Sequence, residues 1–193
     1  MDKKPGRNRS VFYRQTGAMG TVMDIVVPGL TDDRGAMLMK EIRNRLALLE
    51  MNLSNYIPDS VVSRINRTPP GTEVVVGEEL CTILSGLVRY HELTGGYFDF
   101  TLGAWTSPPD RRDPGQDALA HFVSIPMQER IVIKEKSVTR LHPDAVIDAG
   151  GFGKGIALSD TEKIVRSAGI SSAFISFGRS SVLALGAHPQ GDR

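Results

Sequence analysis

A glycine-rich stretch near the middle of the second half constrains the fold of this chain most. Residues 146–156 read VIDAGGFGKGI, so an apolar strand end is followed by Asp148, four glycines and Lys154. Glycine has no Cβ, so such a turn lets main-chain N–H groups approach phosphate oxygens, and the lysine adds a cation. The stretch predicts a strand-to-helix turn that binds a charged ligand. Many glycine-rich turns only connect two elements, and that alternative stays open.

Apolar spacing and turn residues predict the other elements. Helices are expected at residues 32–52, 60–65, 78–94 and 159–168, the second capped by Asp59 or Ser60 and the third closed by Gly95 and Gly96. Strands are expected at residues 21–27, 73–76, 124–126 with 130–133, 137–141, 172–177 and 182–185, with a turn at Pro143 and Asp144. The proline-rich segment 107–118 is expected to be an exposed loop. Because strands and helices alternate irregularly, the pattern favours an α+β fold with a mixed or antiparallel sheet and packed helices.

Length and composition limit the domain organisation. The chain has 193 residues, of which 40% are apolar, enough to bury the core of one domain. Residues 1–15 are polar and basic, and we expect them to form a flexible leader. Residues 16–193 are then expected to form a single domain.

Charge and residue usage argue against several classes of protein. The 23 basic and 22 acidic residues nearly cancel, which disfavours a nucleic-acid partner. No segment approaches the roughly 20 apolar residues that span a bilayer, and the first residues lack a signal-peptide core, so we expect a cytoplasmic chain without a membrane partner. Cys81 lies among apolar residues and is expected to be a buried thiol. The four histidines share no spacing, which argues against zinc.

Three further clusters stand at predicted element ends. They are AMGT at residues 18–21, LSNYIPDSVVSRIN at 53–66 and TGGYFDFTLGAW at 94–105. Together with the glycine-rich stretch they resemble, in order and at similar intervals, the motifs of the FAD:protein FMN transferase family, also called the ApbE type. The resemblance covers residues 19–186.

The resemblance implies a fold, a reaction and a site. It implies an ApbE-like, T-fold-like architecture and transfer of FMN from FAD, with Mg²⁺, to a threonine or serine hydroxyl of an acceptor flavoprotein, releasing AMP. It assigns FAD binding to Met19, Tyr56, Tyr97, Phe98, Asp99, Asp148 and Lys154, and metal binding to the main-chain carbonyl of Gly151. The residue types suit these roles, since aromatic faces stack on rings, carboxylates accept hydrogen bonds from ribose or adenine, and a lysine pairs with a diphosphate.

Each residue also has a purely structural interpretation. Met19 can fill a core, and Tyr97 and Phe98 can pack at a strand start. Asp99 and Asp148 can cap turns, and Lys154 can be a solvated helix charge.

The chain departs from the family pattern in two places. The family's later HIxxP-like segment and its acid followed by serine or threonine do not occur before Arg193, so no catalytic residue is assigned. Arg179 follows Gly178 where the family usually has a second glycine, and an arginine there can reach a phosphate or block the pocket. Three explanations stay open: a transferase chain completed by a second polypeptide or a homo-oligomer, an FAD-binding module without transfer, or a relative without a ligand.

Generic nucleotide motifs fit less well. GGFGKG lacks the GxGxxG spacing of dinucleotide folds, and Lys154 is followed by glycine, not by the serine or threonine of a P-loop. A purely structural role leaves the four clusters unexplained.

Overall fold

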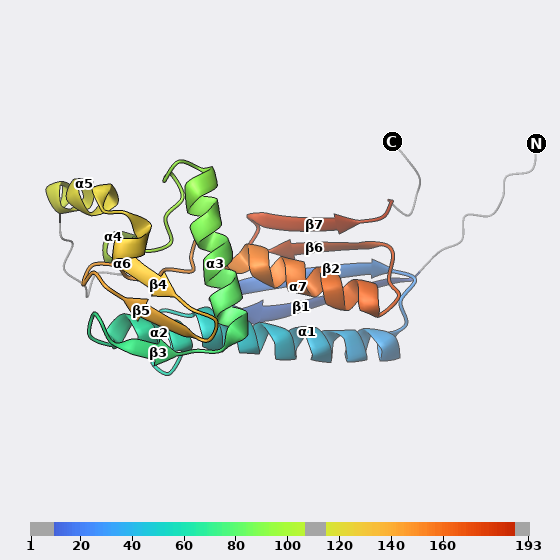
Figure 1. Ribbon diagram of the computed structural model, residues 1–193. Helices are drawn as coiled ribbons and strands as arrows, with labels where there is room; N and C mark the ends of the chain where they lie inside the picture. The colour runs from blue at the N-terminus through green and yellow to red at the C-terminus, as the bar shows by residue number, and fades with distance from the viewer. Residues whose placement is uncertain (1–9, 107–114, 188–193) are drawn as a thin grey trace, which may run out of the picture. The chain divides into compact units, whose positions relative to one another are not determined.

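The structure is a computed structural model that describes residues 10–106 and 115–187. The chain divides into two compact units. Unit 1 takes in the described parts of Met1–Glu50 and Phe152–Arg193, and unit 2 is formed from Met51–Gly151. Each unit is described separately below (Figure 1).

Unit 1 is built on a four-stranded antiparallel sheet with strand order β1-β2-β6-β7. The strands are β1 (Val11–Ala18), β2 (Thr21–Pro28), β6 (Ala173–Phe177) and β7 (Ser181–Leu185). Although β2 and β6 are far apart in the sequence, they pair directly, with Ile25 opposite Ile175. The β1–β2 and β6–β7 pairs are hairpins, so both of their turns lie at the same end of the central pair β2–β6.

One face of this sheet carries the core of unit 1. Along β2, Met23, Ile25 and Val27 are buried, whereas the residues between them are half-buried or exposed, as strand alternation requires. Two helices accompany the sheet, α1 (Asp32–Leu53) and α7 (Gly153–Ser167), and α7 packs on β6 and β7 (Figure 1). A buried stripe on α1 repeats at helical spacing and consists of Leu38, Ile42, Leu46 and Leu49.

Unit 2 combines short helices with a small sheet. Its helices are α2 (Val61–Arg67), α3 (Glu78–Leu93), α4 (Gly103–Thr106), α5 (Gln116–Ser124) and α6 (Met127–Arg130). Its strands are β3 (Glu73–Val75), β4 (Ile131–Ile133) and β5 (Ser137–Arg140), antiparallel in the order β3-β5-β4. Leu102 and Val146 form an isolated parallel bridge.

Buried polar side chains hold the loops of unit 2 together. The guanidinium of Arg140 donates hydrogen bonds to the carbonyls of Ile65, Thr68, Pro143 and Ala145 at 2.8–3.1 Å. A buried arginine is tolerated only when its donors are satisfied, and these four acceptors come from the end of α2 and from the loop at residues 143–145. Arg140 therefore ties the end of α2 to the segment that leads to Val146.

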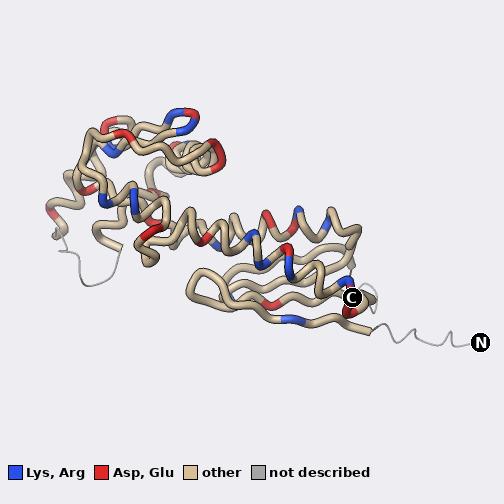
Figure 2. The backbone as a smooth tube through the Cα atoms, turned by 90° about the horizontal axis from the view of Figure 1, so that it is seen from below, with Lys and Arg blue, Asp and Glu red and all other residues tan. Residues whose placement is uncertain are grey.

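Charges of both signs are interspersed along the described parts of both units (Figure 2). None of the helices in residues 10–106 and 115–187 is long and apolar enough to cross a membrane.

The expected α+β fold is confirmed, and most predicted elements are present. The helix predicted at residues 32–52 is α1, that at 78–94 is α3, and the predicted strand at 21–27 is β2. Ser60 caps α2 by accepting a hydrogen bond from the Ser63 N–H at 3.0 Å. Gly95 and Gly96 end α3 with positive φ angles of 61° and 86°.

Other expectations about elements were wrong. β1 begins at Val11, so the strand includes residues 11–15 of the expected leader, whose first nine residues lie outside the described chain. Residues 124–126 are not a strand but the end of α5 and the turn before α6. α7 begins at Gly153, six residues before the predicted start. Of the loop predicted at 107–118, residues 107–114 lie outside the description, and Gln116 already begins α5. Whether residues 16–193 act as one domain stays a prediction.

Candidate functional site

Two tight turns lie next to each other at one end of the unit 1 sheet. Met19 and Gly20 join β1 to β2 with φ angles of 50° and 67°, the left-handed backbone that suits a two-residue hairpin. Gly178 and Arg179 begin the turn between β6 and β7 with φ angles of 63° and 59°. The Gly178 N–H donates to the Val22 carbonyl at 2.9 Å. The AMGT cluster and the turn that carries Arg179 are therefore neighbours.

Lys154 belongs to the same end of unit 1. It lies in the first turn of α7, half-buried, and its Cδ is 3.2 Å from the position that a Cβ on Gly178 would occupy. Thr21 Oγ1 is 3.1 Å from the same position. The absence of a side chain at residue 178 thus allows the lysine, the threonine and the hairpin turn to approach one another.

The first turn of α7 has main-chain donors to offer. The first N–H groups of a helix have no partner within it, and the N-cap residue Phe152 supplies no side-chain acceptor. In the β1–β2 turn, the Met19 N–H donates to Glu50 Oε1 at 3.0 Å. The backbone of Met19 is therefore anchored while its side chain stays half-buried.

In unit 2, the carboxylate of Asp148 orients the glycine-rich turn. Its Oδ1 accepts the Gly150 N–H at 2.8 Å, and its Oδ2 accepts the hydroxyl of Thr106 at 2.5 Å. The side chain is half-buried, so part of the carboxylate faces solvent. Asp148 therefore holds the start of the turn and still presents oxygen to a ligand.

The strand-like segment before Asp148 is fixed by a buried asparagine. Asn66, the last residue of the second motif cluster, accepts the Ile147 N–H and donates to the Ile147 carbonyl, both at 2.9 Å. Its amide also donates to Asn55 Oδ1 at 2.9 Å. Asn66 thus positions Asp148 through the main chain of the preceding residue.

A close contact between two backbone segments positions Thr106, the other hydrogen-bond partner of Asp148. The Gly103 N–H donates to the Val146 carbonyl at 2.8 Å, and a Cβ on Gly103 would lie 2.7 Å from that oxygen. Only glycine fits this position without displacement. Gly103 begins α4, which carries Thr106, so the contact places the hydroxyl beside Asp148.

Asp99 is occupied inside unit 2. Its side chain is 2% exposed, and it pairs at 2.5 Å with Arg130, which is 1% exposed. Asp99 Oδ1 also accepts the N–H and hydroxyl of Thr101 at 2.8 and 2.6 Å. Arg130 donates further to the carbonyls of Ile125 and Val123 and lies 4.5 Å from the ring centre of Phe122. The carboxylate thus holds the TGGYFDFTLGAW segment to the β4 side of the unit.

The aromatic residues of the predicted site are unequally exposed. Tyr97 is 98% exposed and Tyr56 78%, whereas Phe98 is half-buried. The Phe98 carbonyl lies 2.9 Å from His91 Nδ1, and its ring is 3.7 Å from the position of a Cβ on Gly151. The Tyr56 backbone is held by Ser54, whose hydroxyl accepts the Tyr56 N–H at 3.1 Å. Two tyrosine faces are therefore open to a ligand.

The structure distributes the predicted residues over both units. Met19 and Lys154 belong to unit 1, whereas the other residues of the predicted set belong to unit 2: Tyr56, Tyr97, Phe98, Asp99, Asp148 and Gly151. Within unit 2, Phe98 lies beside Gly151, and Asp148 holds the turn that contains it.

Sequence reasoning missed three residues that shape this region: Asn66, Thr106 and Arg130. Asn66 was visible as the last residue of its motif cluster, but its partner Ile147 is 81 positions away. No local sequence pattern pointed to Thr106 or Arg130, because their partners are distant in the sequence. Thr106 pairs with Asp148, 42 positions away, and Arg130 pairs with Asp99, 31 positions away.

The oxygen-rich neighbourhood of Asp148 suits a hard cation. A carboxylate, an exposed threonine hydroxyl and main-chain carbonyls are the ligand types that Mg²⁺ takes, together with several retained waters. Among residues 10–106 and 115–187, no three His, Cys, Asp or Glu side chains cluster as a ligand set of their own.

Cys81 has a structural environment. It is buried, and its thiol lies 3.7 Å from the Ser137 carbonyl. Burial raises the pKa of the thiol, which keeps it protonated and unreactive near neutral pH. The expectation of a buried thiol is confirmed.

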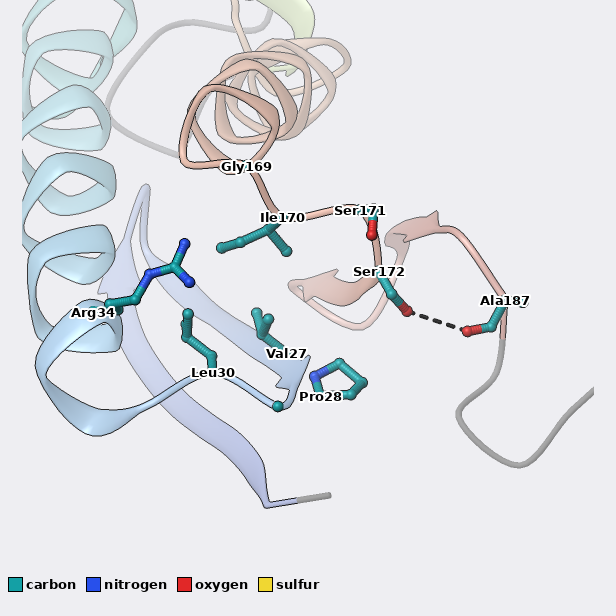
Figure 3. A pocket seen from close by; sticks show the side chains of 10 residues that line it. Val27, Pro28, Leu30, Arg34, Gly169, Ile170, Ser171, Ser172 and Ala187 are labelled. Atoms are coloured by element: carbon teal, nitrogen blue, oxygen red, sulfur yellow. Dashed lines mark hydrogen bonds between the residues drawn. The ribbon is translucent and has the colours of Figure 1, made fainter. Parts of the chain in front are cut away.

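A cavity of about 330 Å³ lies at the opposite end of unit 1 (Figure 3). It is lined by the last residues of β2 and by Gly169–Ser172, which follow α7, whereas Thr21 and Lys154 stand at the beginnings of the same two elements. Arg34 and Ile170 line it together, and the Arg34 guanidinium donates to the Ala168 carbonyl at 2.9 Å. None of the residues predicted to bind FAD lines this cavity.

Comparison with known proteins agrees with the motif pattern. The profile of the ApbE family matches residues 19–193. A curated FAD:protein FMN transferase of Vibrio cholerae serotype O1 is 25% identical over 183 residues, which cover 91% of this chain and 54% of that protein. A protein of the same name from Chlamydia trachomatis serovar D is 28% identical over 137 residues, covering 67% of this chain and 43% of that protein. The chain thus spans about half the length of these relatives.

Solved structures share the fold. The flavin transferase ApbE from Vibrio cholerae superposes with a TM-score of 0.80 at 22% identity, covering 95% of this chain and 62% of that one. The apo form of the flavinyl transferase ApbE from Pseudomonas stutzeri gives a TM-score of 0.79 at 20% identity, covering 99% of this chain and 65% of that one.

Proposed function

The chain belongs to the ApbE family, and on this premise we propose that it is an FAD:protein FMN transferase. One observation carries the proposal: the family match runs over residues 19–193 and so includes every residue that the motifs assign to FAD and to the metal. FAD is then the substrate, and a threonine or serine of an acceptor flavoprotein receives the FMN group.

The proposed reaction is a phosphoryl-type transfer. The acceptor hydroxyl oxygen forms a bond to the FMN phosphorus, the bond from this phosphorus to the bridging oxygen breaks, and AMP leaves with that oxygen. The hydroxyl proton passes to a base, for which these residues offer no assigned candidate. Because little covalent chemistry is asked of the protein, catalysis rests on positioning and on stabilising charge.

Residues of unit 1 are proposed to bind the phosphates. Lys154 supplies a positive charge beside the unpaired N–H groups at the start of α7, which are oriented to receive an anion. Within the described part of the chain, no carboxylate lies within ion-pair distance of Lys154, so its charge is free for a phosphate. Met19 is proposed to contact FAD from the neighbouring hairpin.

Residues of unit 2 are proposed to bind the rest of FAD. The open faces of Tyr56 and Tyr97 suit a flat ring, and Phe98 can complete the contact. Asp148 can accept hydrogen bonds from ribose or adenine and, with the Gly151 carbonyl, can bind Mg²⁺. When bound, Mg²⁺ would offset the charge that develops on the leaving phosphate. Thr106 and Asn66 hold Asp148 in place for both roles.

Asp99 has a positioning role in this proposal. Its carboxylate is buried and bonded to Arg130 and Thr101, which supports an effect on FAD through the placement of Tyr97 and Phe98. The main chain of residues 97–99 remains available to the ligand.

The alternative function is an FAD-binding module without transfer activity. It is favoured by one observation, that the described residues offer open tyrosine faces and a partly open Asp148 for FAD while none of them is assigned to a catalytic step.

The test separates binding from transfer. The purified chain is titrated with FAD in the presence and absence of Mg²⁺, and flavin fluorescence gives the affinity. It is then incubated with FAD, Mg²⁺ and a flavoprotein acceptor, and AMP release and covalent flavin are measured. Saturable binding with AMP release supports the transferase, and binding without AMP release supports the module.

Variants test the assigned residues. Asp148→Asn and Lys154→Ala are each expected to weaken FAD binding about tenfold or more, because each removes a charged contact. Lys163→Ala is the matched control, since this lysine is exposed on the same helix and pairs with Asp160. Unchanged FAD affinity in both test variants would remove the assignment.

A further inference from the structure

Arg179 has an unusual backbone for its residue type. Its φ of 59° lies in the left-handed region, where a residue with a Cβ is less stable than glycine. The side chain is exposed, and it is not buried against a core that would offset this strain. A purely structural requirement at this turn would be met better by glycine. The backbone geometry therefore does not explain the arginine at this position, whereas its charge can.

The position of the turn supplies a second observation. Gly178, the preceding residue, is bonded to Val22, and the Cβ position on Gly178 is 3.1 Å from Thr21 Oγ1 and 3.2 Å from Lys154 Cδ. Arg179 is thus joined directly to the residue against which Lys154 packs. Two cations are carried by adjacent parts of one end of unit 1.

The charges around these cations compensate them only in part. Within residues 10–106 and 115–187, neither Lys154 nor Arg179 is within ion-pair distance of a carboxylate. The Asp24 carboxylate interacts with Arg179 at longer range, and its Oδ1 accepts hydrogen bonds from Tyr13 at 2.7 Å and Gln15 at 2.9 Å. These two hydrogen bonds, with a smaller effect of the Arg179 charge, lower the pKa of Asp24. Glu50, the other acid at this end, accepts the Met19 N–H.

We propose that Arg179 is a second phosphate-binding cation beside Lys154, and that it raises the affinity of this chain for ligands with a diphosphate. The inference rests on the proposed function, because the diphosphate in question is that of FAD. A diphosphate carries more than one negative charge, and a single lysine leaves part of it unpaired. A guanidinium can donate two parallel hydrogen bonds to phosphate oxygens, which an ammonium cannot.

The Arg179→Gly variant separates binding from folding. Glycine accepts a φ of 59° without strain, so the thermal midpoint of unfolding should stay the same or rise. FAD affinity, measured by flavin fluorescence, should fall about tenfold, in line with the loss of a charge-assisted contact. Arg179→Lys should lose less, because it keeps the charge. Riboflavin, which has no phosphate, should show no difference between wild type and Arg179→Gly.

The salt dependence gives an independent measurement. The FAD affinity of the wild type should fall more steeply with added salt than that of Arg179→Gly, since one ionic contact is missing in the variant. A structural role alone would lower the thermal midpoint of Arg179→Gly and leave this slope unchanged.

The outcomes distinguish this inference from the function on which it rests. If Lys154→Ala weakens FAD binding and Arg179→Gly does not, or tightens it, the inference is overturned and the FAD site stands. If the wild type does not bind FAD, the proposed function itself fails and the inference fails with it. If the wild type binds FAD but neither Lys154→Ala nor Arg179→Gly changes the affinity, the inference fails and the proposed function stands.

Discussion

Unit 1 and unit 2 are stabilised in different ways. Unit 1 relies on apolar alternation along strands and helices, so that Ile25 and Ile175 meet across β2 and β6 in an apolar core, and the buried charge in the described part of this unit, Asp160, is paired with Arg45. Unit 2 has short elements, and buried polar groups such as Arg130, Arg140 and Asn66 hold its loops. The difference shows that long amphipathic elements can present functional groups at their ends, whereas loops must be fixed by hydrogen bonds before they can do so.

The largest expected effect tests the buried ion pair of unit 2. Arg130→Ala leaves the Asp99 carboxylate buried without its partner, which is expected to lower the free energy of unfolding by about 3–5 kcal/mol. Urea unfolding followed by the fluorescence of Trp105, the only tryptophan and part of unit 2, measures this loss.

The matched control is Lys136→Ala, which breaks an exposed pair with Glu78 in the same unit. Its effect should stay below about 1 kcal/mol. If Arg130→Ala and Lys136→Ala lowered the free energy of unfolding by similar amounts, the larger cost expected for the buried pair would be contradicted.

The second prediction concerns the apolar core of unit 1. Ile25 is fully buried, and Ile25→Ala should lower the free energy of unfolding by roughly 2–5 kcal/mol, because a cavity remains. Val182→Ala changes an apolar residue that is 56% exposed on the other sheet face and should cost less than about 0.5 kcal/mol.

Circular dichroism and Trp105 fluorescence, recorded on the same Ile25→Ala samples, sharpen the comparison. If the fluorescence transition moves with the circular dichroism transition, the units unfold together. If it does not move, unit 2 unfolds independently.

The third prediction concerns the link between stability and the candidate site in unit 2. Asn66→Ala leaves the N–H and carbonyl of Ile147 without partners, so a loss of about 2 kcal/mol is expected. FAD affinity should fall as well, since Asp148 follows directly. Asn55→Ala removes only one acceptor for the Asn66 amide and should have the smaller effect on both. Equal effects would argue against the role of Asn66 in positioning Asp148.

The smallest effect is a pH dependence in unit 1. Burial acts to raise the pKa of Asp160, but the hydrogen bonds and charges of Lys163 and Arg45 outweigh it and lower the pKa below its usual 3.8. A carboxyl whose pKa is lower in the folded state stabilises the protein above its ordinary pKa, and this contribution is lost as the pH falls through the lowered value. Urea midpoints of wild type and Asp160→Asn should therefore differ at pH 7 and converge at acid pH. A difference that persists at low pH would contradict this explanation.

Sequence patterns predicted the elements with strong periodicity. The long amphipathic helix α1 and the β-branched strand β2 were clear, because each buries one face along its whole length. β1 was missed because Phe12 is its only buried residue and because the strand directly follows the polar and basic residues at the start of the chain, so that its first half resembled part of a leader. The early start of α7 was missed since glycine has low intrinsic helix propensity, yet Gly153 begins the helix.

The candidate site was predictable in its residues but not in its contacts. The motif clusters named Asp99 and Asp148 equally, and the structure distinguishes them: Asp99 is buried against Arg130, while Asp148 is partly open. The partners that create this difference lie tens of positions away, where no local pattern indicates them. The same holds for the left-handed turn at Arg179, which depends on the register of β6 and β7.

The contact between Gly103 and the Val146 carbonyl limits the substitutions that this chain can accept at residue 103. Any methyl group introduced there would have to push two backbone segments apart, and the hydroxyl of Thr106 would move away from Asp148 with them. An alanine at residue 103 of the four-residue helix α4 would therefore disturb the candidate site indirectly, through the hydrogen bond between Thr106 and Asp148. Mutational tolerance at position 103 should accordingly be narrow, although the residue carries no chemistry of its own.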